Sequence, residues 1–399
     1  MTAWRYVLAQ LARRPLQTLL SVLLLALGVA TLVFVLLVQA QLARTLARDA
    51  QGVDLVVGAK GSPLQLILSA VYHVDIPTGN VPFATLEKLR ANRLVKSAIP
   101  VALGDNHRGF RIVGTEPALL AHYGARFAQG TAWDGSMQAV IGSAVAQATG
   151  LAVGARFFGT HGLSADGAAH EDAQYLVVGV LAPTGTVLDR LLLTGLDSVW
   201  AMHEGEPADE DERRILQSAR EVTAVLVQYA SPLAAALLPR QVNADGAQMA
   251  AVPANEVARL FALLGVGIDV MRAFAAILMG SALLALFVAL MNALEERRYD
   301  IAIMRLLGAS RARVAVLLLI EAWLLAAAAV AAGTGIALAA AALVARALAQ
   351  ARSFDLSLAR WPAEVGWVLL AAFTVATLAA LLPAWRAGRM PVHATLAQG

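Results

Sequence analysis

The feature that most constrains this chain is a set of four apolar runs, each long enough to cross a lipid bilayer. An α-helix rises 1.5 Å per residue, so about 20 apolar residues cover a hydrocarbon core of ~30 Å. We therefore expect four transmembrane helices. The first run exceeds the ~7–15 apolar residues of a signal peptide, so it reads as an uncleaved anchor, although Val38-Gln39-Ala40 also suits cleavage. The runs cover residues 16–38, 274–294, 314–343 and 365–382.

Composition separates a membrane part from a water-soluble part. The chain is 59% hydrophobic and 15% charged, whereas soluble domains have about 45–50% apolar and about 25% charged residues. Residues 44–259 nevertheless carry 17 Lys and Arg against 21 Asp and Glu, as a soluble domain would. The overall charge of +3 therefore comes from the membrane-flanking segments, which favours a lipid bilayer over nucleic acid as partner. The absence of cysteine excludes disulfides, thiolate metal sites and a cysteine nucleophile.

The placement of arginine predicts the orientation. Positive residues accumulate on the cytoplasmic side of membrane helices, so we expect both termini inside and the large soluble segment outside the inner (plasma) membrane. A short outer loop with Arg346, Arg352 and Arg360 is a mild exception. Ten arginines follow the rule: Arg5, Arg13, Arg14, Arg297, Arg298, Arg305, Arg311, Arg313, Arg386 and Arg389.

These signals predict nine segments in a fixed order. We expect a cytoplasmic amphipathic N-terminus, a first span, a large extracytoplasmic domain, a second span and a cytoplasmic loop. A third span, a short outer loop, a fourth span and a cytoplasmic C-terminus follow. Their bounds are 1–15, 16–40, 41–265, 266–294, 295–312, 313–345, 346–363, 364–385 and 386–399.

The extracytoplasmic segment predicts an α+β domain. Residues 54–57, 110–113, 175–178 and 222–227 are rich in β-branched and aromatic side chains, which is typical of strands. Residues 83–92 and 143–149 have helical character, and Pro82 precedes the first of them. We expect exposed loops at 161–172 and 203–212, the second because it is strongly acidic.

Catalytic and metal sites find little support in the sequence. His73 near Asp75 is compatible with a general base, but a local hydrogen bond is the simpler interpretation. His161 with His170-Glu171-Asp172 would chelate a metal only loosely, so we expect no metal site. No Gly-x-x-x-x-Gly-Lys-Ser/Thr sequence occurs, so ATP hydrolysis is expected in a separate subunit.

One ionisable residue and one loop carry the strongest functional signals. Glu321 lies inside the third apolar run, where either a buried partner or an extended side chain reaching the interface would account for it. The loop 295–314 predicts a short amphipathic helix, with Gly308 ending it and Ser310 beginning the next. Such a helix either lies in the membrane interface or docks into a partner protein.

The loop resembles the coupling segment of the FtsX-like permease family, which includes the MacB and LolC/LolE membrane subunits. Glu296-Arg297, Asp300-Ile301-Ala302-Ile303, Arg305 and Leu307-Gly308-Ala309-Ser310 carry the resemblance, with Asp300 replacing the usual glutamate. It extends to Ile320-Glu321-Ala322 with Gly333 and Gly335, to Pro383-Ala384-Trp385-Arg386-Ala387, and, for the MacB-type periplasmic core, to segments 139–143, 151–154 and 177–181.

The resemblance implies a type VII ABC transporter subunit without its own ATPase. Two permease chains, as a homodimer, would each bind a cytoplasmic ATPase that supplies ATP and Mg²⁺ chemistry. ATP-driven motion would reach the periplasmic domain by mechanotransmission, for export, extraction or release of a substrate, with a periplasmic adaptor or substrate-binding protein as a further partner. The residues implied to couple to the ATPase are Glu296, Arg297, Asp300, Ile301, Met304, Arg305, Leu307 and Gly308.

Two other classes stay open. A membrane-anchored sensor would bind a ligand outside and signal through the cytoplasmic loop without transport. A membrane enzyme would depend on His73 and Asp75.

Overall fold

In the computed structural model the chain divides into two compact units, one of long helices and one that combines strands with helices. The structure describes residue 7 and residues 11–161, 169–203, 209–244, 246–350 and 361–389. The helical unit comprises residues 1–42, 264–347 and 356–399. The α+β unit comprises residues 43–263 and 348–355.

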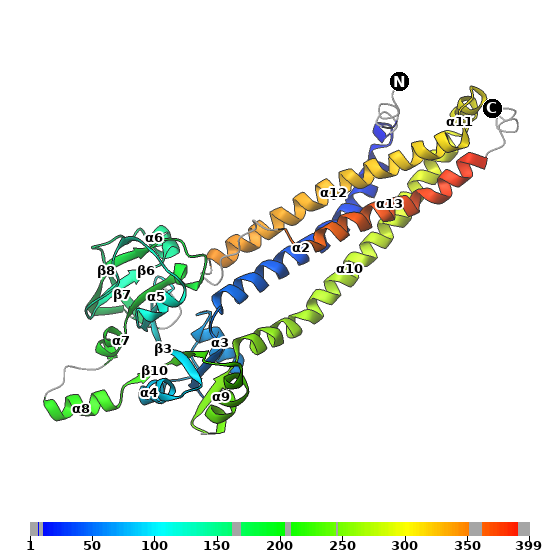
Figure 1. The fold of residues 1–399 in the computed structure, drawn as a ribbon. Coiled ribbons are helices and arrows are strands. Elements are labelled where there is room, and N and C mark those ends of the chain that lie inside the picture. The colour runs from blue at the N-terminus through cyan, green and yellow to red at the C-terminus, as the bar shows by residue number, and fades with distance from the viewer. Residues whose placement is uncertain are drawn as a thin grey trace. The chain divides into compact units, whose positions relative to one another are not determined.

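Four long helices account for the four apolar runs, which confirms the predicted number of candidate membrane spans. They are α2 (Pro15–Asp49), α10 (Pro253–Glu296), α12 (Arg311–Gln350) and α13 (Glu364–Arg389), and a short helix α11 (Arg298–Leu306) connects α10 to α12 (Figure 1). At 1.5 Å per residue the 44 residues of α10 extend about 66 Å, more than twice the ~30 Å of a hydrocarbon core. This helix therefore continues well beyond its apolar run.

Small residues let the long helices pack closely. One buried cluster joins all four of them, with Val29 of α2, Leu286 of α10, Ala329 of α12 and Ala376 of α13 among its members. A Cβ atom on Gly333 of α12 would lie 2.5 Å from the backbone oxygen of Ala26 in α2. The backbones thus approach within a distance that only glycine permits, as is common between helices in membranes.

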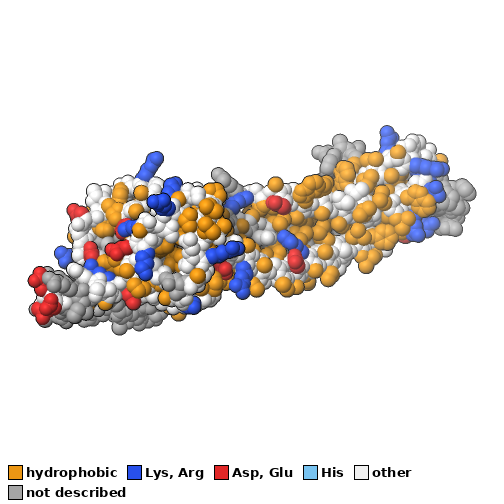
Figure 2. Space-filling model, turned by 60° about the horizontal axis from the view of Figure 1, so that its bottom comes forward, with side chains coloured by type: hydrophobic (Ala, Val, Ile, Leu, Met, Phe, Trp, Pro, Cys, Tyr) orange, Lys and Arg blue, Asp and Glu red, His pale blue; other side chains and the backbone are white. Residues whose placement is uncertain are grey.

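The outward sides of these helices are apolar. On α10 alone, Val266, Val270, Ile277 and Leu284 are exposed. Figure 2 shows hydrophobic side chains predominating along the middle of the long helices on the face in view, with charged side chains over the α+β domain and at the far end of the helices. This distribution is the reverse of a soluble helix bundle and fits helices surrounded by lipid.

The α+β domain is built on one mixed sheet, which has ten strands among the described residues. Its strand order is β12-β1-β11-β3-β4-β9-β6-β8-β5, and β7 pairs with β3 and β8; β2 and β10 form a separate pair. The pairs β4–β9 and β6–β8 are parallel and the other pairs are antiparallel. The strands are β1 (Leu55–Ala59), β2 (Val81–Pro82), β3 (Val95–His107), β4 (Phe110–Thr115), β5 (Phe127–Gly130), β6 (Gln138–Ile141), β7 (Arg156–His161), β8 (Ala169–Leu181), β9 (Leu191–Gly195), β10 (Glu221–Val222), β11 (Ala224–Tyr229) and β12 (Gln248–Ala251).

Short helices cover this sheet and enclose two separate cores. One core lies around β1, β11 and β12, and the other around β4, β6 and β8. The 13-residue strand β3 is long enough to pair with strands of both halves. The helices are α3 (Pro63–Ala70), α4 (Ala84–Ala91), α5 (Ala118–His122), α6 (Ser143–Thr149), the 3₁₀ helix η1 (Val187–Arg190), α7 (Leu196–His203), α8 (Glu210–Ser218) and α9 (Pro232–Ala244).

The predicted α+β class is confirmed, and most of the expected elements are present. Strands form at 55–59, 110–115 and within 169–181, and helices form at 84–91 and 143–149. The run 222–227 is divided between β10 and β11 at Thr223, whose hydroxyl accepts a hydrogen bond from the Leu103 backbone N–H at 2.9 Å. That side-chain contact takes the place of a regular ladder position.

Both expected loops are wrong where the structure describes them. His161 ends β7, and residues 169–172 begin β8, because the two strands pair with Thr160 opposite Ala169. His203 ends α7, and Glu210 to Glu212 form the first turn of α8, where negative charge favours a helix N-terminus. Residues 162–168 and 204–208 lie outside the described part of the chain, as do most of the N-terminus, the predicted outer loop from 351 to 360 and the C-terminus from 390.

Candidate functional site: the connection between α10 and α12

The predicted amphipathic helix in the loop 295–314 is confirmed as α11. Glu296 ends α10, Arg297 precedes α11, and Gly308 follows it with a φ of +98°. The N–H of Gly308 donates to the oxygen of Arg305, and the N–H of Ala309 donates to the oxygen of Met304. This pair of bonds is the Schellman arrangement, which requires the left-handed conformation that glycine adopts without strain.

The next helix begins with the expected cap. The Ser310 hydroxyl accepts a hydrogen bond at 3.2 Å from the N–H of Arg313, the third residue of α12. A capped end on α11 and a capped start on α12 leave only four residues, 307–310, between them. The connection is therefore short and conformationally defined at both ends.

One side of α11 packs into the helical unit. Ile301 and Ala302 are buried, and Met304 is half-buried. They contact a cluster drawn from three of the long helices, formed by Leu294, Val314, Leu318, Ala384 and Ala387. Movement of α11 would therefore act directly on the ends of α10, α12 and α13.

The other side of α11 is exposed, and it carries apolar residues beside the charged Arg298 and Asp300. Tyr299, Ile303 and Leu306 are exposed, and Leu307 has 84% of its surface accessible. Asp300 is exposed beside them, in the first turn of the helix. An exposed apolar side held on a rigid, capped helix is the usual form of a helix that docks into a groove of another protein.

A buried ion pair joins the start of α11 to α12. Arg297 donates from Nη1 to Oε2 of Glu321 at 2.9 Å and from Nη2 to Oε1 at 3.3 Å, with side chains 10% and 6% exposed. The parallel two-bond geometry is the strongest form of an arginine–carboxylate pair. Glu321 thus has a buried partner instead of extending to the interface, which decides between the two interpretations left open by the sequence.

Further charges surround this pair. Arg14, just before α2, forms an ion pair with Glu296 at the end of α10. Two cavities of about 20 Å³ each adjoin the Arg297–Glu321 pair, and both residues line each of them. Each cavity has room for about one water molecule. The structure therefore brings Glu296, Arg297 and Glu321 together with Arg14, which the sequence pattern did not associate with them.

The His73–Asp75 pair expected of an enzyme does not form. His73 is buried, and its Nδ1 has no hydrogen-bond partner among the described residues. Asp75 instead accepts the N–H of Ile76 at 2.7 Å. Burial, followed by the positive charges of Arg190 and Arg111, lowers the pKa of His73 to about 3. A histidine in that environment is a poor general base near neutral pH.

The charged groups around His73 have a structural arrangement. Arg190 donates to Oδ2 of Asp49 and to the backbone oxygen of Tyr72, both at 3.1 Å. Tyr123 donates to the backbone oxygen of Asp49 at 2.6 Å. These bonds connect the end of α2 to η1 and to the residue that follows α5. The cluster therefore fixes the position of the end of α2 against the α+β domain. The metal ligands considered from the sequence, His161 and His170 to Asp172, have side chains outside the described residues.

Comparison with known proteins gives two family matches that together cover most of the chain. Residues 18–245 match the MacB-like periplasmic core domain, and residues 272–392 match the FtsX-like permease C-terminal model. No curated protein matches the sequence.

Solved structures give weaker similarities. The periplasmic region of MacB from Actinobacillus actinomycetemcomitans aligns with 10% identity and a TM-score of 0.36, over 54% of this chain and 95% of that one. The extracellular domain of the noncanonic ABC-type transporter YknZ from Gram-positive bacteria aligns with 11% identity and a TM-score of 0.31, over 49% and 98%. At these scores the structural similarity adds no argument to the family matches.

The two family matches appear in the order of the helices and the α+β domain, with the first model covering more than half of the chain. They also agree with the four candidate spans. This chain belongs to the FtsX-like permeases with a MacB-like periplasmic core domain, a family of ABC-type permeases whose ATPase is a separate subunit.

Proposed function

We propose that this chain transmits ATP-driven motion of a cytoplasmic ATPase, through α11 and the long helices, to its extracytoplasmic domain. That motion would export, extract or release a substrate at the cell envelope. The observation that carries the proposal is the construction of α11, which has an exposed apolar side and a side packed on three long helices. Displacement of such a helix by a partner would displace the long helices directly, because no flexible loop lies between them.

The Arg297–Glu321 pair supports the same proposal. Because the pair is buried and two-bonded, the start of α11 moves together with α12. The apolar side chains of Leu306 and Leu307 would enter a groove of the ATPase, and that partner would bind ATP and Mg²⁺. This arrangement requires the α10–α12 connection to face the cytoplasm of the inner membrane, as the arginine distribution predicts.

The assembly is proposed to contain two copies of this chain. A homodimer would place two extracytoplasmic domains beside one another, so that motion of the helices changes the space between them. A periplasmic adaptor or substrate-binding protein is a further partner in this proposal, and it would contact the same domains.

Co-purification from the native membrane, followed by mass spectrometry, tests the proposal. We expect a stoichiometric ATPase with Walker motifs to accompany the wild-type chain and to be lost when Leu307 is changed, as Leu307→Asp. The matched control is Leu233→Asp, which makes the same change at an exposed leucine of α9 in the α+β domain. That variant should retain the ATPase.

Either of two results would overturn the proposal. One is recovery of the chain without an ATPase under conditions that keep the permease dimer intact. The other is recovery with a kinase or hydrolase, which would indicate a membrane-anchored sensor. Equal loss of the ATPase in both leucine variants would show that α11 has no special role.

A further inference from the structure

The sheet topology creates a cavity in the α+β domain that the sequence patterns do not indicate. β4 and β9 are parallel neighbours, so both end at the same edge of the sheet, with Thr115 opposite Gly195. β6 runs antiparallel to β9, so it begins at this edge. The segments that leave or enter these strands surround a cavity of about 660 Å³. The carboxyl ends of parallel strands are a common position for ligand sites, and this volume is typical of small-molecule pockets.

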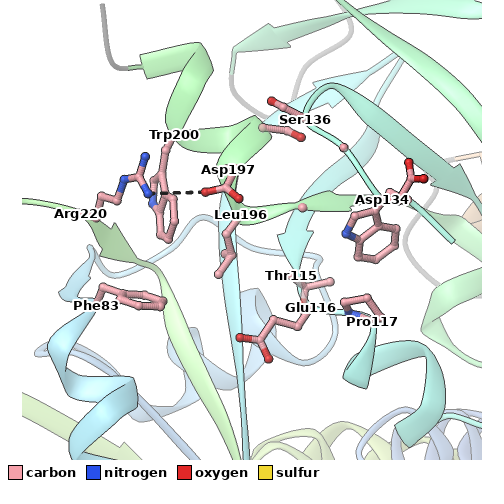
Figure 3. Close-up of a pocket in the computed structure, with 14 residues that line it drawn as sticks. Phe83, Thr115, Glu116, Pro117, Asp134, Ser136, Leu196, Asp197, Trp200 and Arg220 are labelled. Carbon is pink, nitrogen blue, oxygen red and sulfur yellow. Dashed lines mark hydrogen bonds and ion pairs between the residues drawn. The ribbon is translucent and has the colours of Figure 1, made fainter. Parts of the chain in front are cut away.

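One wall of the cavity is aromatic. Trp200 of α7 is contacted edge-on by the ring of Phe83, with 5.3 Å between ring centroids. The guanidinium of Arg220 lies over the Trp200 ring at 4.4 Å and forms an ion pair with Asp197 at 3.5 Å (Figure 3). Trp200 and Arg220 also line a second cavity of about 260 Å³. Trp200 therefore borders both cavities and offers an apolar surface to a ligand.

Of the three carboxylates in the cavity lining, one has no partner among the described residues. Glu116 is bound by Arg90 at 2.6 Å, and Asp197 is bound by Arg220. The carboxylate of Asp134 has no ion-pair or hydrogen-bond partner among the residues that the structure describes. Figure 3 shows Asp134 on the far side of the cavity from Arg220. A cation that enters the cavity would meet this carboxylate without having to displace a protein group.

A tryptophan whose N–H is free among the described residues also lines the cavity. Trp133 lines it with only 9% of its surface exposed, and its indole N–H has no acceptor in the described part of the chain. Its Nε1 atom lies 3.4 Å from the position of a Cβ on Gly195, which is also in the wall. Nε1 is not among the buried side-chain atoms that lack a partner, so this N–H is accessible from the cavity and available to a ligand that carries an acceptor.

We propose that this cavity binds a small organic cation, namely a protonated amine on an aromatic or apolar body that carries a hydrogen-bond acceptor. The ammonium group would pair with Asp134, the body would lie against Trp200 and Phe83, and the acceptor would take the Trp133 N–H. Among the described residues of the lining, the cationic side chain is Arg220, which Asp197 and Trp200 already engage. An anionic ligand would therefore be repelled by the unpaired carboxylate of Asp134 and would find no free cationic partner in the described lining.

The role of this site as the place where cargo binds rests on the proposed transport function. Ligand binding to the cavity does not depend on that function. The binding proposal and the transport proposal can therefore fail independently, and the experiment measures binding to the full chain without any ATPase.

The test uses the full-length chain in lipid nanodiscs and three fluorescent probes with the same dansyl body. Dansylcadaverine is a cation, N-pentyldansylamide is its neutral analogue, and dansylglycine is an anion; all three carry sulfonyl acceptors. Fluorescence titration gives the dissociation constant of each probe, with empty nanodiscs subtracted. We expect dansylcadaverine to bind at least about tenfold more tightly than the neutral analogue, and dansylglycine more weakly than either.

Variants locate the binding. Asp134→Asn should weaken dansylcadaverine about tenfold and leave the neutral probe unchanged, because it removes only the charge. Trp133→Phe should weaken both probes, because each carries the acceptor. The matched control is Glu87→Gln, which removes an exposed carboxylate of α4 outside the cavity and should bind both probes as the wild type does. Unchanged thermal unfolding of Asp134→Asn, a change at an exposed residue, shows that the fold is intact.

The proposal is overturned if dansylcadaverine and its neutral analogue bind equally, or if Asp134→Asn binds the cation as the wild type does. A short peptide with one lysine and one tryptophan offers the same chemistry. If it displaces the probe at a tenfold lower concentration than phenylbutylamine, the cavity serves a polypeptide and the small-cation assignment is wrong. Cation binding without a co-purifying ATPase would keep the site and remove the transport role. Co-purification of an ATPase without any cation binding would support the transport function and remove the ligand site.

Discussion

Two ion pairs between buried side chains in the described part of this chain join different elements. Arg297 and Glu321 belong to the α10–α11 junction and to α12, and Asp49 and Arg190 belong to α2 and to η1. A buried ion that loses its partner keeps the cost of desolvation without the compensating attraction. Such pairs therefore fix which elements lie together more strongly than they stabilise the fold.

The Arg297–Glu321 pair gives a prediction that separates these two effects. Glu321→Leu leaves Arg297 buried and unpaired, so we expect it to destabilise the chain by about 3–5 kcal/mol. Adding Arg297→Leu should recover most of that loss, because the double variant buries no charge. Thermal unfolding of the purified variants in detergent measures both. A double variant as unstable as the single one would show that the pair itself, and not the unpaired charge, carries the stability.

His73 gives a prediction on pH. Burial and two arginines lower the pKa of this residue to about 3, whereas unfolded histidine has a pKa of about 6.5. As the pH falls below 6.5, His73 becomes protonated in the unfolded chain but stays neutral in the folded chain. The free energy of unfolding therefore decreases by up to about 1.4 kcal/mol per pH unit.

The variant for this test is His73→Asn. It removes the titrating group and suits the backbone φ of 55°, since asparagine tolerates the left-handed region. We expect its thermal midpoint to fall less steeply than that of the wild type between pH 7.5 and 5. Parallel pH profiles of the two proteins would mean that His73 is not the group responsible.

At the scale of elements, close approach of the helices depends on particular glycines. Gly333 of α12 faces the Ala26 oxygen of α2, whereas Gly335, two residues on, has no atom within 4 Å of its would-be Cβ. The same substitution at these two sites therefore compares packing with intrinsic helix preference.

We expect Gly333→Ala to destabilise the helical unit by about 1–3 kcal/mol, because α12 and α2 must separate to admit the methyl group. Gly335→Ala should be neutral or stabilising by up to about 1 kcal/mol, since alanine favours a helix over glycine. Thermal unfolding in detergent compares them. Equal stability of the two variants would contradict the close contact between α12 and α2.

At the scale of the whole molecule, the absence of cysteine makes the membrane orientation directly measurable. Leu233→Cys introduces a thiol at an exposed position of the α+β domain, and Leu307→Cys introduces one after α11. A membrane-impermeant maleimide applied to intact spheroplasts should label the first variant, and should label the second only after permeabilisation. The reverse pattern would invert the topology and place α11 away from any cytoplasmic ATPase.

The elements whose existence depends on local pattern were predictable. The four apolar runs required four long helices, because length and hydrophobicity are properties of a continuous segment. Gly308 and Ser310 marked the end of α11 and the start of α12, since each acts on backbone groups within three residues of itself. The loop expected at 161–172 failed because strand pairing, which involves distant partners, extended β7 and β8 into it.

What the sequence by itself determined is therefore the number of candidate spans, the α+β class of the domain and the capped helix α11. Only the tertiary structure decided that Glu321 meets Arg297, that His73 is influenced by Arg190 and Arg111 and does not pair with Asp75, and that Trp133, Asp134 and Trp200 line one cavity. The physical reason is that these contacts join residues far apart in the chain. Their meeting depends on the register of paired strands and on the packing of helices, and neither is encoded in any single segment.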